Sequence, residues 1–267
     1  MTRIWIALAL FAALVAGPYA PAVRATVAVV QCKVFHGSGV GTSMTLAMNS
    51  TITTGAEMVV FASMSGGSPI TSVTDDAASC GGYTDTGVAT SSIFLWKCNG
   101  TTVNAGTITV NTTGTIVQGN IAACEITGQA ASNEIDTSNT ATPGSSSTPQ
   151  GAAVTTSTAN TAIVSVTRAV NTAASLTGIH SGNAFTQGSI DNGGAVADGI
   201  AYLVASSTGT YQSQWDLDIA DSTQSITVAI KQLGGGGAVY PGGIPNSPIR
   251  GCCGLGWLFD VFNTLTR

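Results

Sequence analysis

Residues 56–76 read AEMVVFASMSGGSPITSVTDD, and this stretch decides the predicted fold. Residues 58–62 form an unbroken apolar run of strand length, a Gly-Gly-Ser-Pro break follows at 66–69, and a second strand begins at Ile70. A run that is apolar on both faces is typical of a strand in the middle of a sheet that is covered on both sides. We therefore interpret it as the central strand of a β-sandwich.

The composition of the 267-residue chain supports an all-β fold. Only 8% of the residues are charged, against about 25% in an ordinary soluble protein. Thr and Val with many Gly, Ser and Asn residues favour strands joined by turns, whereas surface helices usually carry Glu/Lys pairs. Because 44% of the residues are hydrophobic, the chain can build a sizeable core, which excludes global disorder. We predict a two-sheet antiparallel β-sandwich.

The charge pattern excludes two classes of partner. The net charge is −5, and the eight basic residues do not cluster. Nucleic acids and anionic lipid surfaces are both recognised by clustered Lys and Arg. We therefore expect no nucleic-acid partner, and membrane contact only through the N-terminal segment or the C-terminal tail.

Residues 1–25 have the features of a secretory signal peptide. Arg3 supplies the positive start, residues 4–16 are apolar, and Val-Arg-Ala at 23–25 fits the small-x-small cleavage pattern. The run is short for a spanning helix, which needs ~20 residues, but a retained membrane anchor is the alternative. We expect a signal helix removed after residue 25, and a protein that is secreted to the cell surface or the extracellular space.

The mature chain divides into a β-sandwich domain, residues 26–232, and a Gly-rich linker with a flexible tail, residues 233–267. The long polar segment 128–151 is either an interdomain linker or a crossover between two sheets, and we favour the crossover because each half supplies few strands for a core of its own. No internal repeat of fixed period is visible, which argues against a solenoid or propeller. The tail is either a short amphipathic helix or loosely ordered.

Six cysteines in an exported chain favour disulfides. Connectivity is not fixed by sequence, and a zinc site is the rival for the four core cysteines, although no Cys-x2-Cys spacing occurs. We predict the pairs Cys80–Cys98 and Cys32–Cys124. The adjacent Cys252 and Cys253 of the tail would then bridge to another chain.

The residues offer little for catalysis. The mature chain has two histidines, His36 and His180, and three glutamates, Glu57, Glu125 and Glu134, at unremarkable positions. No Ser/His/Asp or Cys/His set is evident, so we predict that the protein is not an enzyme. A glycosidase pair of Glu125 with an aspartate is the alternative.

Two groups of residues are candidates for ligand binding. Asp216, Asp218 and Asp221 in WDLDIAD could supply oxygen ligands to calcium, and the alternative is a solvated strand end. Calcium is the one cofactor that the sequence suggests. Trp96, Trp215 and Tyr83 could stack on sugar rings if they are exposed, and core packing is the alternative.

Several stretches together resemble a family of secreted bacterial and phage-associated β-sandwich domains. They are MVVFASMSGGSPITSVTDD, SSIFLWKC with the Thr/Val strand after it, AFTQ at 184–187, GTYQSQW at 209–215 and SITVAIK at 225–231. The resemblance covers residues 27–232 and implies a jelly-roll or concanavalin-like, lectin-like sandwich with no agreed activity. The added cysteines and the Gly-rich, double-Cys tail depart from the family pattern.

These observations together predict a secreted, non-enzymatic structural, adhesion or binding module. A carbohydrate-binding, lectin-like domain and a secreted glycan-active hydrolase are the alternatives. The expected partners are a glycan or another cell-surface component, and further copies of the chain.

Overall fold

The computed structural model describes residues 26–38, 41–65, 69–101, 105–171, 173–193 and 196–233. The chain divides into two compact units, residues 1–235 and 236–267, and every described residue belongs to the first. The predicted signal segment and the tail from residue 234 onward, with Cys252 and Cys253, lie outside the described residues. Within the described ranges, no helix has the length and apolar character needed to cross a membrane.

Almost all regular structure is antiparallel β-sheet, which confirms the all-β prediction. The first large sheet contains, in spatial order, β1 (Ala28–Ser38), β8 (Gln118–Thr127), β3 (Glu57–Ser65), β6 (Ile93–Asn99) and β5 (Thr84–Ala89). The second large sheet contains β13 (Thr186–Asp191), β14 (Asp198–Ala205), β11 (Thr161–Ala169), β17 (Thr223–Lys231) and β9 (Ile135–Ala141).

Smaller sheets accompany the two large ones. The outer sheet consists of β2 (Ser43–Ala47), β7 (Thr107–Thr112) and β4 (Ile70–Asp75). Two outer pairs consist of β12 (Leu176–Ile179) with β16 (Trp215–Leu217), and β10 (Val154–Thr155) with β15 (Thr210–Tyr211). One 3-10 turn, η1 (Ser79–Gly81), follows β4.

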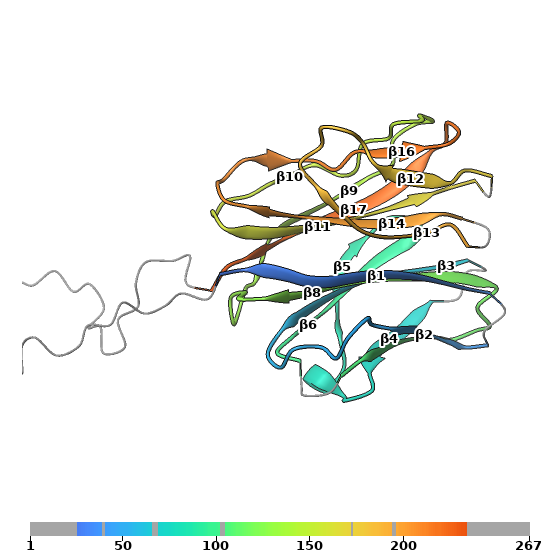
Figure 1. Cartoon of the computed structure of the whole chain (residues 1–267). Coiled ribbons are helices and arrows are strands. Elements are labelled where there is room, and N and C mark those ends of the chain that lie inside the picture. Colours follow the sequence, from blue (N-terminus) through green and yellow to red (C-terminus); the bar gives the residue numbers. More distant parts are fainter. Residues whose placement is uncertain are drawn as a thin grey trace, which may run out of the picture. The chain divides into compact units, whose positions relative to one another are not determined.

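The sheets stack in layers, with the two large sheets facing each other in the middle (Figure 1). Three apolar clusters fill the spaces between layers. The central core lies between the large sheets, the first outer core between the first large sheet and the outer sheet, and the second outer core between the second large sheet and the outer pairs. The sequence predicted two sheets around one interior, whereas the described chain has five sheets and three apolar clusters.

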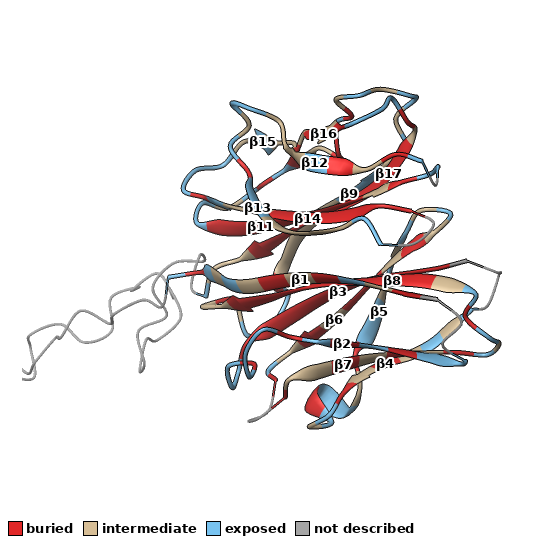
Figure 2. Ribbon diagram, turned by 45° about the vertical axis from the view of Figure 1, so that its right-hand side comes forward, coloured by how far each residue is buried: buried red, intermediate tan, exposed pale blue. Residues whose placement is uncertain are grey.

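This layering explains the sequence patterns. Residues 57–64 of β3 are all buried because the first large sheet is covered on both faces, as the apolar run predicted (Figure 2). β2, which has one face in solvent, alternates between buried Met44 and Leu46 and their exposed neighbours. Continuous apolar runs therefore mark the inner sheets, and alternation marks the outer sheet.

The two halves of the described chain repeat one strand order. In the first half the large sheet runs 1-8-3-6-5 and the outer sheet 2-7-4. The second half consists of β9 to β17, and its strands can be renumbered to match the first half, β1 to β8. In this numbering β9 to β14 are strands one to six, β15 and β16 together are strand seven, and β17 is strand eight. The second large sheet then also runs 1-8-3-6-5, and the outer pairs join strands 2-7 and 7-4. The repeat that the sequence did not reveal is thus a repeat of topology.

The two halves also pack reciprocally across the central core. β1 contacts β13 while β9 contacts β5, and β8 contacts β14 while β17 contacts β6. In the repeat numbering, strand one of each half therefore meets strand five of the other, and strand eight meets strand six. Such mutual contacts are the mark of an isologous interface. The segment 128–151 crosses from the first large sheet to the second and contributes β9 to it.

Both predicted disulfides within the described chain are present. Cys32 and Cys124 are direct partners on the neighbouring strands β1 and β8, and their bond faces the central core. Cys80 of η1 is joined to Cys98 of β6. With sequence separations of 92 and 18 residues, loop closure alone predicts stabilisation by roughly 5 and roughly 3 kcal/mol.

The central core predicts that two phenylalanines of the first large sheet contribute very differently to the free energy of unfolding. Phe61 is 1% exposed in the central core, and Phe35 on β1 is 37% exposed. Replacing Phe61 with Ala should lower the free energy of unfolding by about 3–5 kcal/mol because it leaves a cavity. The matched Phe35→Ala should cost roughly 1 kcal/mol or less. Denaturant unfolding under non-reducing conditions measures both, and equal losses would contradict the central position of Phe61.

Candidate functional site

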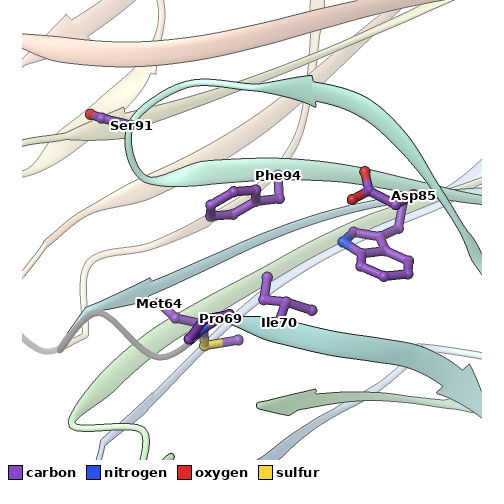
Figure 3. A pocket seen from close by; sticks show the side chains of 7 residues that line it. Met64, Pro69, Ile70, Asp85, Ser91 and Phe94 are labelled. Atoms are coloured by element: carbon purple, nitrogen blue, oxygen red, sulfur yellow. The ribbon is translucent and has the colours of Figure 1, made fainter. Parts of the chain in front are cut away.

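A cleft opens on the outer face of the first large sheet, beside the edge of the outer sheet (Figure 3). It lies where β5 pairs with β6 and not with β4, so that the outer sheet ends at β4 and no other described strand covers this side of the first outer core. The cleft has a volume of about 300 Å3, at the lower end of the range of small-molecule sites. It is lined by Met64, Pro69, Ile70, Asp85, Ser91, Phe94 and Trp96.

The cleft combines apolar walls with the polar side chains of Asp85 and Ser91. Phe94 and Ile70 lie on opposite walls, and the carboxylate of Asp85 lies beside them (Figure 3). Asp85 accepts a hydrogen bond of 2.9 Å from the backbone N–H of Gly87, and Asp85 is exposed to solvent. The indole Nε1 of Trp96 is buried and has no hydrogen-bond partner among the described residues. A ligand with an apolar face and hydroxyl groups would match this combination.

The three aromatic residues predicted to bind sugars lie mainly in cores. Trp215 is fully buried in the second outer core, where a Cβ at Gly199 would come within 2.6 Å of its ring. Tyr83 is 5% exposed, and its hydroxyl donates to Asp75 over 3.3 Å. Burial and the nearby Asp75 carboxylate raise the pKa of Tyr83. Only Trp96, at 8% exposure, reaches the cleft, so open-face stacking is not available to Trp215 or Tyr83.

The predicted calcium ligands do not converge. Asp216 contacts Nδ1 of His180 over 2.6 Å, and Asp218 accepts from the backbone N–H groups of Ser175 and Ile219. Asp221 is buried and accepts from backbone N–H groups that include Val170. In the part of the chain that the structure describes, no three His, Cys, Asp or Glu side chains are grouped to hold a metal ion. These aspartates hold turns and loops in place.

The catalytic alternative finds little support around Glu125. Glu125 is fully buried, and its two oxygens accept from the Gln31 side chain over 2.7 Å and from the Thr53 backbone N–H over 2.8 Å. His180 and Asp216 form a partly exposed pair. A carboxylate that orients a histidine is one part of a nucleophilic triad, but among the described residues no hydroxyl or thiol is hydrogen-bonded to the ring of His180.

Sequence reasoning missed two charged clusters, one at each end of the central core. At one end, Glu57 lies beside the ion pair of Lys97 with Glu134. Glu57 is fully buried, and both of its carboxyl oxygens lack a hydrogen-bond partner among the described residues. Burial raises the pKa of Glu57 to about 7, and the charge of Lys97 acts in the opposite direction. We name these three residues the Glu-Lys-Glu cluster.

At the other end, His36 and Asn120 of the first large sheet meet charged residues of the second. His36 donates from Nδ1 to Asn120 Oδ1 over 2.6 Å, and its backbone N–H donates to Asp191 over 3.0 Å. Asp198 pairs along the ladder with Asp191 and with Arg168. Burial raises the pKa of Asp198 to about 8, although Arg168 lowers it and Asp191 raises it further.

A signal for the buried Glu57 was present in the sequence. Glu57 and Ser63 share the alternating face of β3 that carries Val59 and Phe61 into the central core. A charged residue in phase with the core positions of an apolar strand must be buried or lie at the end of that core. The strand pattern alone, however, does not reveal which residues of the facing sheet meet it.

Comparison of the chain with models of known families, with curated proteins and with solved structures finds no match.

The state of Asp198 predicts how stability depends on pH. Between its ordinary value of 3.8 and its folded pKa of about 8, the folded protein keeps a proton that the unfolded chain has lost. The stabilising contribution is thus complete below pH 3.8 and is lost as the pH rises to about 8, on the order of 1 kcal/mol per pH unit. Asp198→Asn should flatten this slope in denaturant unfolding, whereas Asp85→Asn in the exposed cleft should retain it. An unchanged slope in Asp198→Asn would refute the assignment.

Proposed function

We propose that the protein is a secreted, non-enzymatic structural or adhesion module that acts as a rigid scaffold at the cell surface or outside the cell. The observation that supports this function is that several carboxylates accept hydrogen bonds from the protein's own loops and strands. Glu125 and Asp221 accept backbone N–H groups of distant segments, and Asp75 accepts from Ala77, Ser79 and Tyr83. Side chains committed in this way hold loops in place and are not free for chemistry on a substrate.

The topology supports the same function. We propose that each half is a jelly roll, because strands one, eight, three and six form one sheet while strands two, seven and four form the facing one. Jelly rolls occur in capsid and lectin domains, where they serve assembly and binding.

The compartment agrees with this proposal. Two disulfides are consistent with an oxidising environment, and the N-terminal segment has the pattern of a signal peptide. Export would place the double sandwich outside the cell, where the tail cysteines could join copies of the chain.

The assembly prediction uses the two tail cysteines. The mature chain, purified without reductant, should form particles larger than a monomer in light scattering. The double variant Cys252→Ser, Cys253→Ser should shift the population to monomers while the two internal disulfides remain. A strictly monomeric wild-type chain with intact cysteines would contradict assembly, and release of reducing sugar from a polysaccharide would contradict the non-enzymatic assignment.

Carbohydrate binding is a second candidate function, and the cleft supports it. An aromatic wall and an exposed carboxylate are groups that sugar rings and hydroxyls require. The cleft is small, which fits one or two rings at the end of a glycan.

The cleft yields its own test. On a glycan array, the wild type should bind a defined set of glycans, and Phe94→Ala and Asp85→Asn should each weaken binding by about tenfold, equivalent to about 1.4 kcal/mol. Phe35→Ala, which removes an exposed phenylalanine of the same sheet outside the cleft, should leave binding unchanged. No bound glycan, or equal effects of all three variants, would exclude this function.

A further inference from the structure

The Glu-Lys-Glu cluster lies at the junction of the two halves. Lys97 is near the end of β6 in the first large sheet, and Glu134 directly precedes β9, the edge strand of the second. Their side chains form an ion pair between residues 37 positions apart. The backbone carbonyl of Glu134 also accepts the N–H of Lys231 at the end of β17, which fixes Glu134 at this position.

The surroundings of this ion pair are apolar on the side of the central core, whereas Lys97 also pairs with the exposed Thr84 of β5. Val59 is the ladder partner of Lys97, Ile126 is the ladder partner of Glu57, and both belong to the central core. Ile135 follows Glu134 and packs against the same core. Glu134 is 3% exposed and the Lys97 side chain 27%. Glu134 loses most of its hydration in these surroundings and Lys97 loses part of it, which raises the free energy of the charged pair relative to a neutral product.

Glu57 completes the arrangement. It lies on the same face of the sheet as Lys97, one diagonal step away on β3, because Val59 pairs with Lys97 and Glu57 with Asn99. Its two carboxyl oxygens have no partner among the described residues, which is an unusual state for a fully buried carboxyl. A carboxyl group whose pKa is about 7 can both take and return a proton at neutral pH.

We propose that Lys97 and Glu134 become joined by an intramolecular amide bond, which the folded chain forms by itself with Glu57 as the proton relay. The bond would link the two halves covalently at one end of the central core. This inference does not rest on the proposed function, because the cluster includes none of the residues that line the cleft and neither of the tail cysteines.

The reaction balances without an external reagent. A side-chain rotation first brings a carboxylate oxygen of Glu57 within hydrogen-bond reach of Lys97 Nζ. Glu57 then takes a proton from the Lys97 ammonium, and the freed lone pair on Nζ forms a bond to the carboxyl carbon of Glu134. A C–O bond of Glu134 breaks, and its electron pair stays on the departing oxygen. That oxygen receives two of the three Nζ protons, one of them through Glu57, and leaves as water. The third proton remains on the amide nitrogen, and Glu57 returns to its initial state.

Mass spectrometry of the full chain tests this bond directly. After reduction, the wild type should be lighter by one water molecule than the mass calculated for its residues, and Lys97→Arg should show the full calculated mass. A peptide that joins Lys97 to Glu134 should appear in a proteolytic digest of the wild type only. Lys33→Arg, which replaces a lysine of the same sheet on β1, should retain the mass deficit.

The role of Glu57 has a separate readout. Glu57→Gln should slow formation of the bond by roughly 100-fold, seen as full-mass protein that loses water slowly after folding. If this variant does not fold, the comparison of wild type with Lys97→Arg still decides the matter. A wild-type chain of full calculated mass, or a deficit that persists in Lys97→Arg, would overturn the proposal.

Discussion

The apolar contact between the two large sheets is the constraint on which the rest of the structure depends. Each large sheet contributes one face to the central core and the opposite face to an outer core, so its middle strands are buried throughout. Such strands cannot carry charges in their middle, because an unpaired buried charge costs several kcal/mol. Charged residues in phase with the core, such as Glu57 and Asp198, therefore stand near its ends.

The repeated topology explains why the halves fit each other, and their differences explain where a cleft can form. In the first half the sixth strand supplies Trp96 to the outer core, and in the second half Ala201 occupies the corresponding row. In the second half the tryptophan of the outer core is Trp215 on the outer strand β16, and its ring packs over Gly199 of β14. A large residue in one layer is thus matched by a small one in the other, and the cleft lies on the Trp96 side.

Local pattern predicted the elements better than their arrangement. The apolar run of β3, the alternation of β2 and both disulfide pairs were predicted from composition and spacing. The duplication was not predicted, because the two halves share their strand order but little sequence. One similarity is an aromatic residue followed by Thr at the start of the fifth strand of each half, Tyr83-Thr84 for β5 and Phe185-Thr186 for β13. The burial of Trp215 depends on a glycine of another strand, which no local pattern reveals.

Local sequence pattern also does not predict which residues meet in the charged clusters, because their members come from distant strands. Period-two alternation places Glu57 on the inner face of β3, but only the register of three strands and the crossover brings Lys97 and Glu134 to it. A scaffold whose halves are related by repetition meets at two ends, and each end must accommodate polar groups that the core excludes. One end does so with hydrogen bonds and a proton held by Asp198. Unsatisfied groups do not distinguish the two ends, since Asp198 Oδ2, like both Glu57 oxygens, is buried without a hydrogen-bond partner among the described residues. The ends differ in that Glu57 lies beside the ion pair of Lys97 with Glu134, and this is the end at which we propose that an amide forms.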